Sequence, residues 1–243
     1  MKAFLLAAGL GHRLRPLTED IPKCLLPIRG VPLLAIWLDL CARHGIGEVL
    51  INLHHRGERV QAFLAGYTGP VAVRTTHEPE LLGTAGTVRE NWDFARGERD
   101  FLILYADNLT DADLGALVRG HRASGAPLTI GLFRPPNPEA CGVVALDPSG
   151  LVQGFVEKPS RPISDLASAG IFVASPALRE ALPTAGFADF GLHVLPGLVG
   201  RAHGQLIDGF LCDIGTPDGY RRAQDAQGRL RPGPRATVWA HDD

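Results

Sequence analysis

A glycine-rich segment near the amino terminus carries residues suited to binding a polyphosphate. Residues 6–18 read Leu-Ala-Ala-Gly-Leu-Gly-His-Arg-Leu-Arg-Pro-Leu-Thr, and a Pro-Lys pair ending at Lys23 follows. Because Gly9 and Gly11 lack side chains, backbone N–H groups can approach phosphate oxygens closely. Arg13 and Lys23 would supply positive charge to the same anion. The spacing fits neither a dinucleotide-binding fingerprint, which needs a third glycine, nor a Walker A loop, which needs Gly-Lys-Ser/Thr.

Two carboxylates are candidates for binding a divalent cation beside that phosphate. Asp107 follows the apolar run 101–105, and Asp213 stands in a Cys-Asp-Ile-Gly-Thr-Pro segment. Ligands of open α/β folds bind at the carboxyl ends of the strands, where Asp107 is expected. An aspartate there can instead cap the next helix, but Asp111 and Asp113 are available for that task. Hard oxygen ligands of this kind suit Mg²⁺.

Lysine is rare in this chain, and its positions are informative. Of 24 cationic residues, only Lys2, Lys23 and Lys158 are lysines. A site that keeps lysine among so many arginines indicates a need for a compact ammonium group. Lys158 follows Glu157, and neighbours on a strand normally point to opposite faces. Because Pro159 ends the strand, both side chains can turn toward a cleft, and we interpret this pair as functional.

Apolar runs alternate with helix-like segments in the first half of the chain. This pattern predicts a Rossmann-like, doubly wound α/β fold with a mostly parallel mixed sheet in three αβα layers. The predicted strands are 3–8, 49–53, 71–75, 101–105 and 128–133. The predicted helices are 32–44, 57–64, 84–93 and 113–124. Beyond residue 135 we expect short strands at 142–146, 151–157 and 169–173, with a hairpin turn at 147–150.

Length and composition narrow the possible functions. The 243 residues are 45% hydrophobic and 21% charged, which is typical of one globular domain, predicted here as 1–227 with a tail at 228–243. The net charge of −2 provides no basic field for nucleic acid or a membrane surface. The first residues are interpreted as a buried strand rather than a signal peptide, so we expect a cytoplasmic protein. The four cysteines and nine histidines show no metal-binding spacing.

Taken in chain order, these motifs resemble the signature of the sugar-nucleotide pyrophosphorylase family, the sugar-1-phosphate nucleotidyltransferases. The resemblance covers roughly residues 1–225 and is strongest to mannose- and heptose-1-phosphate guanylyltransferases. It implies a GT-A-like fold, Mg²⁺ as cofactor, and a nucleoside triphosphate and a sugar 1-phosphate as substrates. The products would be a nucleotide-sugar and pyrophosphate. The chain resembles short forms of the family, since no six-residue apolar repeat indicates a C-terminal β-helix.

The resemblance implies a catalytic role for five charged residues. Arg13 would hold the departing pyrophosphate, and Lys23 would contact phosphate. Asp107 and Asp213 would bind Mg²⁺, and Lys158 would bind the sugar phosphate.

Further residues would bind the nucleotide and the sugar. The loop 82–86, Leu-Gly-Thr-Ala-Gly, resembles the nucleobase loop of the family. Glu78 could accept hydrogen bonds from guanine, or from the imide N–H of uracil or thymine, which slightly favours guanine. The nucleotide-binding set is Leu6, Ala7, Ala8, Gly9, Gly11, Arg13, Lys23, Glu78, Gly83, Thr84 and Asp107. The sugar-phosphate-binding set is Asn108, Gly142, Glu157, Lys158 and Gly170.

Several alternatives stay open at this point. Ala106 and Ser168 replace the glycine and asparagine usual in the family, which is compatible with a non-catalytic, nucleotide-sugar-binding regulatory relative. The string Asp111-Ala112-Asp113 matches the Asp-x-Asp of nucleotide-sugar-dependent glycosyltransferases. GTP with mannose or heptose 1-phosphate is the favoured substrate pair, and UTP or dTTP with glucose 1-phosphate is the alternative. A homodimer is compatible with the sequence, which does not specify an oligomeric state.

Overall fold

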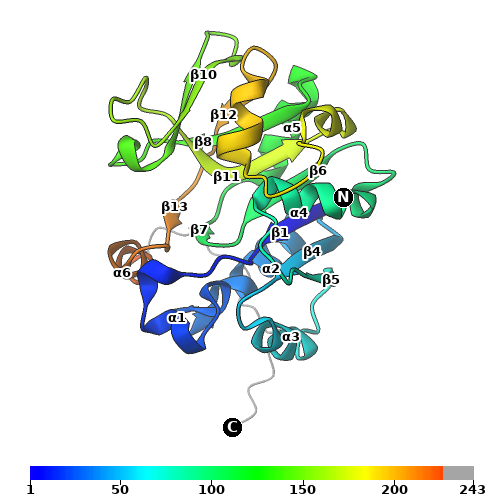
Figure 1. The fold of residues 1–243 in the computed structure, drawn as a ribbon, viewed down its shortest axis with the longest axis vertical. Helices are drawn as coiled ribbons and strands as arrows, with labels where there is room; N and C mark the ends of the chain where they lie inside the picture. Colours follow the sequence, from blue (N-terminus) through cyan, green and yellow to red (C-terminus); the bar gives the residue numbers. More distant parts are fainter. Residues whose placement is uncertain (227–243) are drawn as a thin grey trace.

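The structure is a computed structural model that describes residues 1–226, so the predicted tail at 228–243 lies outside the described residues. Figure 1 shows β1, β4 and β5, in blue to cyan, below β8, β10 and β11, in green to yellow. The parallel half of the central sheet has the order β6 (Phe101–Tyr105), β1 (Lys2–Leu6), β4 (Glu48–Leu53) and β5 (Ala72–His77).

The second half of the sheet is built around an antiparallel strand. β11 (Ala167–Ala174) pairs antiparallel with β6 and extends the sheet beyond it. Beyond β11 the sheet branches: one branch is β9 (Gly142–Leu146) followed by β10 (Val152–Glu157), and the other is β8 (Leu128–Phe133) followed by β12 (His203–Leu206). The turn between β9 and β10 is held by the Asp147 carboxylate, which accepts hydrogen bonds from the Ser149 and Leu151 N–H groups. The hairpin prediction is therefore confirmed.

Helices cover both faces of the sheet. Successive strand side chains enter different cores, as in β6, where Leu102 and Leu104 enter one and Phe101 and Ile103 the other. The first core includes side chains of α2 (Leu33–Arg43), α3 (Gly57–Ala65) and α5 (Leu114–Ser124). The second includes side chains of α4 (Thr84–Glu90), the π-helix Phe190–Val194 and the 3-10 turn Leu195–Leu198. This arrangement confirms the doubly wound, three-layer prediction.

Several elements differ from the predictions. The predicted helix 84–93 ends at Glu90, where the side chain of Asn91 donates to the Thr87 carbonyl and a 3-10 turn, Trp92–Ala95, follows. The predicted first strand, 3–8, ends at Leu6, because the N–H of Ala7 bonds to the Asn52 side chain instead of a strand. The pattern did not predict α1 (Leu17–Asp20), α6 (Pro217–Gln224), β2 (Pro27–Ile28), β3 (Val31–Pro32), β7 (Asn108–Thr110), β12 or β13 (Leu211–Asp213).

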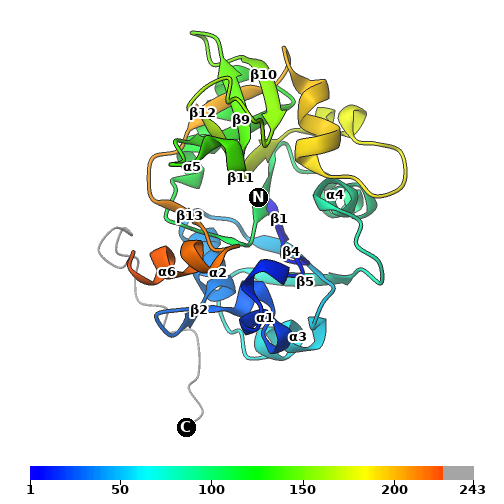
Figure 2. The same ribbon diagram turned by 60° about the vertical axis from the view of Figure 1, so that its left-hand side comes forward.

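The pair β7–β13 connects distant parts of the chain. It is antiparallel, with Asp213 opposite Asn108. Figures 1 and 2 both show β13 between α6 and the strands of the second half. No helix in the described part of the chain is long and apolar enough to cross a membrane.

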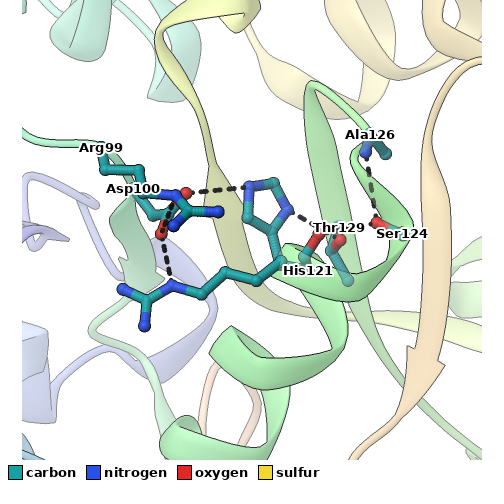
Figure 3. A network of polar contacts seen from close by, with 7 residues as sticks. Arg99, Asp100, His121, Ser124, Ala126 and Thr129 are labelled. Carbon is teal, nitrogen blue, oxygen red and sulfur yellow. Dashed lines mark hydrogen bonds and ion pairs between the residues drawn. The ribbon is translucent and has the colours of Figure 1, made fainter.

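A polar cluster lies where β6 begins, and we call Asp100, His121, Arg122 and Thr129 the amino-end cluster. All of its members are buried except Arg122, whose side chain is 45% exposed. Figure 3 shows the His121 ring between Asp100 and Thr129. The Asp100 carboxylate, only 5% exposed, accepts from Arg122 Nε at 2.7 Å, and His121 Nδ1 lies 2.9 Å from Thr129 Oγ1. The cluster ties the start of β6 to α5 and β8.

Candidate active site

A first cavity, of about 240 Å³, opens where the parallel strands end. The chain leaves β1, β4, β5 and β6 at this end, so the residues that follow these strands meet there. Every residue of the predicted nucleotide-binding set except Gly11 and Arg13 lines this cavity. Its lining is Leu6, Ala7, Ala8, Gly9, Lys23, Cys24, Asn52, Glu78, Leu81, Gly83, Thr84, Tyr105, Ala106, Asp107, Phe187 and Asp189.

The glycine-rich loop is held in a turn that only glycine adopts without strain. Gly11 has a φ of 66°, in the left-handed region, and a Cβ there would lie 2.8 Å from Thr18 Cγ2. The Thr18 hydroxyl donates to the Gly11 carbonyl at 2.8 Å, so the threonine of the Pro-Leu-Thr segment fixes the loop. Asn52 accepts a hydrogen bond from the Ala7 N–H at 2.7 Å and fixes the other end.

The two aspartates predicted as metal ligands are neighbours in space. Asp107 ends the β6 segment, and the N–H of Ile214 donates to its carbonyl at 3.0 Å. The β7–β13 pairing then places Asp213 beside it. Desolvation of its carboxylate and the nearby charge of Asp107 raise the pKa of Asp213. The Lys23 ammonium lies 2.6 Å from Asp107 Oδ2 and neutralises part of this charge.

Arg13 approaches the same point, although it does not line the first cavity. A Cβ added at Gly215 would lie 2.8 Å from Asp213 Oδ1 and 3.0 Å from both Arg13 Nη2 and Lys23 Nζ. The three charged groups thus surround Gly215. We call Arg13, Lys23, Asp107 and Asp213 the carboxyl-end cluster.

The donor set of this cluster fits Mg²⁺. No group of three or more His, Cys, Asp or Glu residues that could hold a metal occurs in residues 1–226. Asp107 and Asp213 would supply two carboxylates and leave the remaining positions to water and substrate. Mg²⁺ is typically bound in this way, by one or two carboxylates together with phosphate oxygens.

A second cavity, of about 220 Å³, adjoins the aspartates. Every residue of the predicted sugar-phosphate-binding set except Lys158 lines this second cavity. Its lining is Tyr105, Asp107, Asn108, Phe133, Ala140, Cys141, Gly142, Phe155, Glu157, Ser168, Ala169, Gly170, Phe172, Asp189, Gly191, Leu195, Leu211 and Asp213.

Lys158 lies outside the lining of this cavity. Its side chain is 68% exposed, and its ammonium lies 3.9 Å from Glu157 Oε1. Its backbone φ of 46° is rare for a residue with a side chain, and its N–H donates to the Cys141 carbonyl at 2.9 Å. Backbone strain of this kind clusters at functional sites.

Comparison with known proteins identifies the family. Residues 2–228 match the sequence model of the family described as Nucleotidyl transferase. The chain belongs to this family.

Curated relatives of this nucleotidyl transferase chain use different nucleotides. A UTP–glucose-1-phosphate uridylyltransferase from Synechocystis is 32% identical over 82% of the chain and 55% of its own length. A glucose-1-phosphate thymidylyltransferase from Streptomyces griseus is 36% identical over 75% of the chain and 51% of its own length. A mannose-1-phosphate guanyltransferase from Schizosaccharomyces pombe is 30% identical over 90% of the chain and 62% of its own length. The chain thus spans just over half of each relative's length.

Solved structures share the fold at low sequence identity. HddC from Yersinia pseudotuberculosis is 22% identical, with a TM-score of 0.79 over 93% of this chain and 99% of that chain. A second HddC structure, complexed with GMP-PN, is 23% identical, with a TM-score of 0.77 over the same shares.

The position of Glu78 differs from the expectation that its carboxylate faces a nucleobase. The residue is only 1% exposed. Its carboxylate accepts hydrogen bonds from Asn52 Nδ2, the Thr87 hydroxyl and the Leu82 N–H. Both carboxylate oxygens therefore have donors, which come from β4, from α4 and from the segment before α4. Because Glu78 is buried and already accepts these three hydrogen bonds, it holds the wall of the first cavity, and its position gives no support for a preference for guanine.

Asn52, Tyr105 and Asp189 line the cavities but were not predicted. Asn52 had a sequence signal, since it is the one polar residue in the apolar run Val-Leu-Ile-Asn-Leu. Asp189, which lines both cavities, had none, because no motif or periodic pattern surrounds it.

Both aspartates of the Asp-x-Asp string, which had suggested a glycosyltransferase, accept hydrogen bonds from backbone N–H groups. Asp111 accepts a hydrogen bond from the Phe210 N–H at 2.7 Å and is buried. Asp113 caps α5, where it accepts from the Ala116 N–H at 2.8 Å. Neither aspartate lines the two cavities.

Proposed function

We propose that this protein transfers a nucleoside monophosphate from a nucleoside triphosphate to a sugar 1-phosphate, releasing pyrophosphate. One observation carries the proposal. Lys23, Asp107 and Asp213 meet where a cavity edged by the glycine-rich loop adjoins a cavity lined by Glu157 and other polar groups. The matched family and its sugar-1-phosphate nucleotidyltransferase members support the same chemistry.

The reaction exchanges one phosphoanhydride bond for another. The attacking phosphate oxygen of the sugar 1-phosphate is already ionised at neutral pH, so no strong general base is required. The main obstacle is repulsion between two polyanions that must align at the α-phosphorus. Catalysis then consists of positioning and charge neutralisation, as in other phosphoryl-transfer enzymes.

Residues of the carboxyl-end cluster and its surroundings divide this work. Lys23 would neutralise phosphate near the reacting centre, and Arg13 would stabilise the departing pyrophosphate. Lys158, on an exposed and flexible stem beside Glu157, would hold the sugar phosphate. Asp107 and Asp213 would hold Mg²⁺, which when bound supplies positive charge to the phosphate oxygens.

The favoured substrates are GTP and mannose or heptose 1-phosphate. The guanyltransferase from Schizosaccharomyces pombe covers more of the chain, 90%, than the uridylyl- and thymidylyltransferases described above. UTP or dTTP with glucose 1-phosphate is the alternative, because those two relatives have slightly higher identity.

A pyrophosphate-release screen tests this function. GTP, UTP, dTTP, ATP and CTP would each be combined with mannose, heptose and glucose 1-phosphates, with and without EDTA. We expect release that needs both substrates, is greatest with GTP and mannose or heptose 1-phosphate, and returns when Mg²⁺ is added after EDTA. Tight binding of a nucleotide-sugar without release from any pair would instead support a non-catalytic regulatory relative.

A further inference from the structure

The second cavity is rich in carboxylates and poor in cations. Asp107, Glu157, Asp189 and Asp213 all line it. Among the described residues of this lining, none is lysine, arginine or histidine. Asp107 and Asp213 face Lys23 and Arg13, which leaves Glu157 and Asp189 as a separate acidic pair.

Two glycines make room for this acidic pair. A Cβ at Gly191 would lie 2.6 Å from Glu157 Oε2 and 3.3 Å from Asp189 Oδ1. A Cβ at Gly142 would lie 2.7 Å from the same Glu157 oxygen. The two carboxylates therefore converge on Gly191 at one wall of the cavity. Because the two glycines have no side chains, they leave room for the carboxylates at this wall.

Asp189 is held rigidly in this position. Its Oδ1 accepts from the Gly191 N–H at 2.8 Å and from the Leu192 N–H at 3.4 Å, and its Oδ2 accepts from the Thr84 hydroxyl at 2.9 Å. Thr84 belongs to the wall of the first cavity and also receives a hydrogen bond from Tyr105. Because each carboxylate oxygen has two lone pairs and Oδ2 accepts from Thr84 alone, Asp189 Oδ2 can still accept a hydrogen bond from a ligand hydroxyl group.

The charges of the pair act on each other. Burial raises the pKa of Glu157, Lys158 opposes that shift, and the negative charge of Asp189 adds to it. A third anion brought to the Asp189 side of this wall would meet the same repulsion, because the Lys158 ammonium lies outside the lining and is 3.9 Å from Glu157 Oε1. A hydroxyl group, in contrast, donates favourably to a carboxylate.

We propose that Asp189, together with Glu157, selects sugar 1-phosphates whose sugar carries hydroxyl groups and no second negative charge. Asp189 acts as a specificity-determining residue through repulsion of the wrong substrate as well as attraction of the right one. The inference rests on the proposed function for its catalytic readout. The acidic pair would exclude hexuronic acid 1-phosphates and hexose bisphosphates.

Matched sugar pairs test the selection. The pairs are glucose 1-phosphate against glucuronic acid 1-phosphate, and mannose 1-phosphate against mannose 1,6-bisphosphate, each with the nucleotide that is active in the screen. We expect kcat/KM to favour the neutral sugar by on the order of 10²-fold, since like charges at close range cost several kcal/mol. In Asp189→Asn, which keeps an acceptor for Gly191, we expect this ratio to fall about tenfold.

The control is Asp93→Asn, which removes an exposed carboxylate paired with Arg96 away from both cavities and should leave the ratio unchanged. If Asp189→Asn has no thermal unfolding transition, Glu157→Gln should lower the ratio in its place. Equal use of neutral and anionic sugars by the unaltered protein, or a ratio unaffected in Asp189→Asn, would overturn the inference. Absence of turnover with every sugar would reject the proposed function alone, because calorimetric binding of the same pairs still measures the selection.

Discussion

The two charged clusters at the ends of β6 differ in how completely their charges are satisfied. In the amino-end cluster, Asp100 is 5% exposed, His121 is 2% exposed, and neither borders one of the two cavities. In the carboxyl-end cluster, Asp107 is 39% exposed and borders both cavities, while Asp213 is exposed and lies beside a like charge. We therefore expect charged residues to serve stability at one end of β6 and ligand binding at the other.

The difference follows from the parallel sheet. Where β6 begins, the polar groups are enclosed by α5 and β8, so they must pair with one another. Where β6 ends, the neighbouring parallel strands also end, and their loops separate around open space. Substitutions at the two ends should therefore change different quantities.

The largest effect is expected at Asp107. Asp107→Asn removes the charge that would bind Mg²⁺, so turnover should fall by about 10²–10³-fold, as when one group stabilising a transition state is removed. Unfolding should change little, because the residue is partly exposed. Steady-state pyrophosphate release and a thermal melt measure the two quantities. Near-normal turnover would remove Asp107 from the metal site.

A somewhat smaller loss of activity is expected from Gly215→Ala. The added Cβ would displace the tips of Arg13, Lys23 and Asp213, which are flexible, so the fold should survive while the cluster opens. A misplacement of this size is expected to lower kcat/KM by about 10–10²-fold. Gly47→Ala is the matched control, since its Cβ would meet nothing within 4 Å. Equal activity of the two variants would contradict the crowded geometry at Gly215.

At the amino end, the expected effect is on stability. Asp100→Asn weakens a partly buried, charge-assisted hydrogen bond with Arg122 and should lower the free energy of unfolding by about 1–3 kcal/mol. Urea denaturation measures this loss, and turnover per folded molecule should be retained below the transition. Loss of turnover without loss of stability would show that the two ends are not separate in function.

The smallest effect is a pH dependence of stability from His121. Burial lowers the pKa of His121 below its ordinary value of 6.5, against the opposing charge of Asp100. The unfolded chain therefore binds this proton more readily, so stability is present above pH 6.5 and falls as the pH drops below it. His121→Gln should reduce, but not abolish, this slope in urea titrations between pH 7.5 and 5.5, because burial also lowers the pKa of His44.

The local elements could be predicted where a pattern lies within a few residues. Strands Phe101–Tyr105 and Leu128–Phe133 were predicted at both ends, since each is an apolar run bounded by turns. The short strands β7 and β13 could not be, because three residues carry no periodicity, and their pairing depends on contacts between distant segments.

The sequence by itself determined the doubly wound fold, the turn at Gly11 and the residue types suited to phosphate and Mg²⁺. These depend on backbone conformations and apolar periods that neighbouring residues set. Only the tertiary structure decided which charges share a space: it brought Asp213 to Asp107 and enclosed Glu78. It also left Lys158 at the surface and placed Asp189 between the cavities. Such meetings depend on how the strands are ordered and paired, and that order arises from the packing of the whole core.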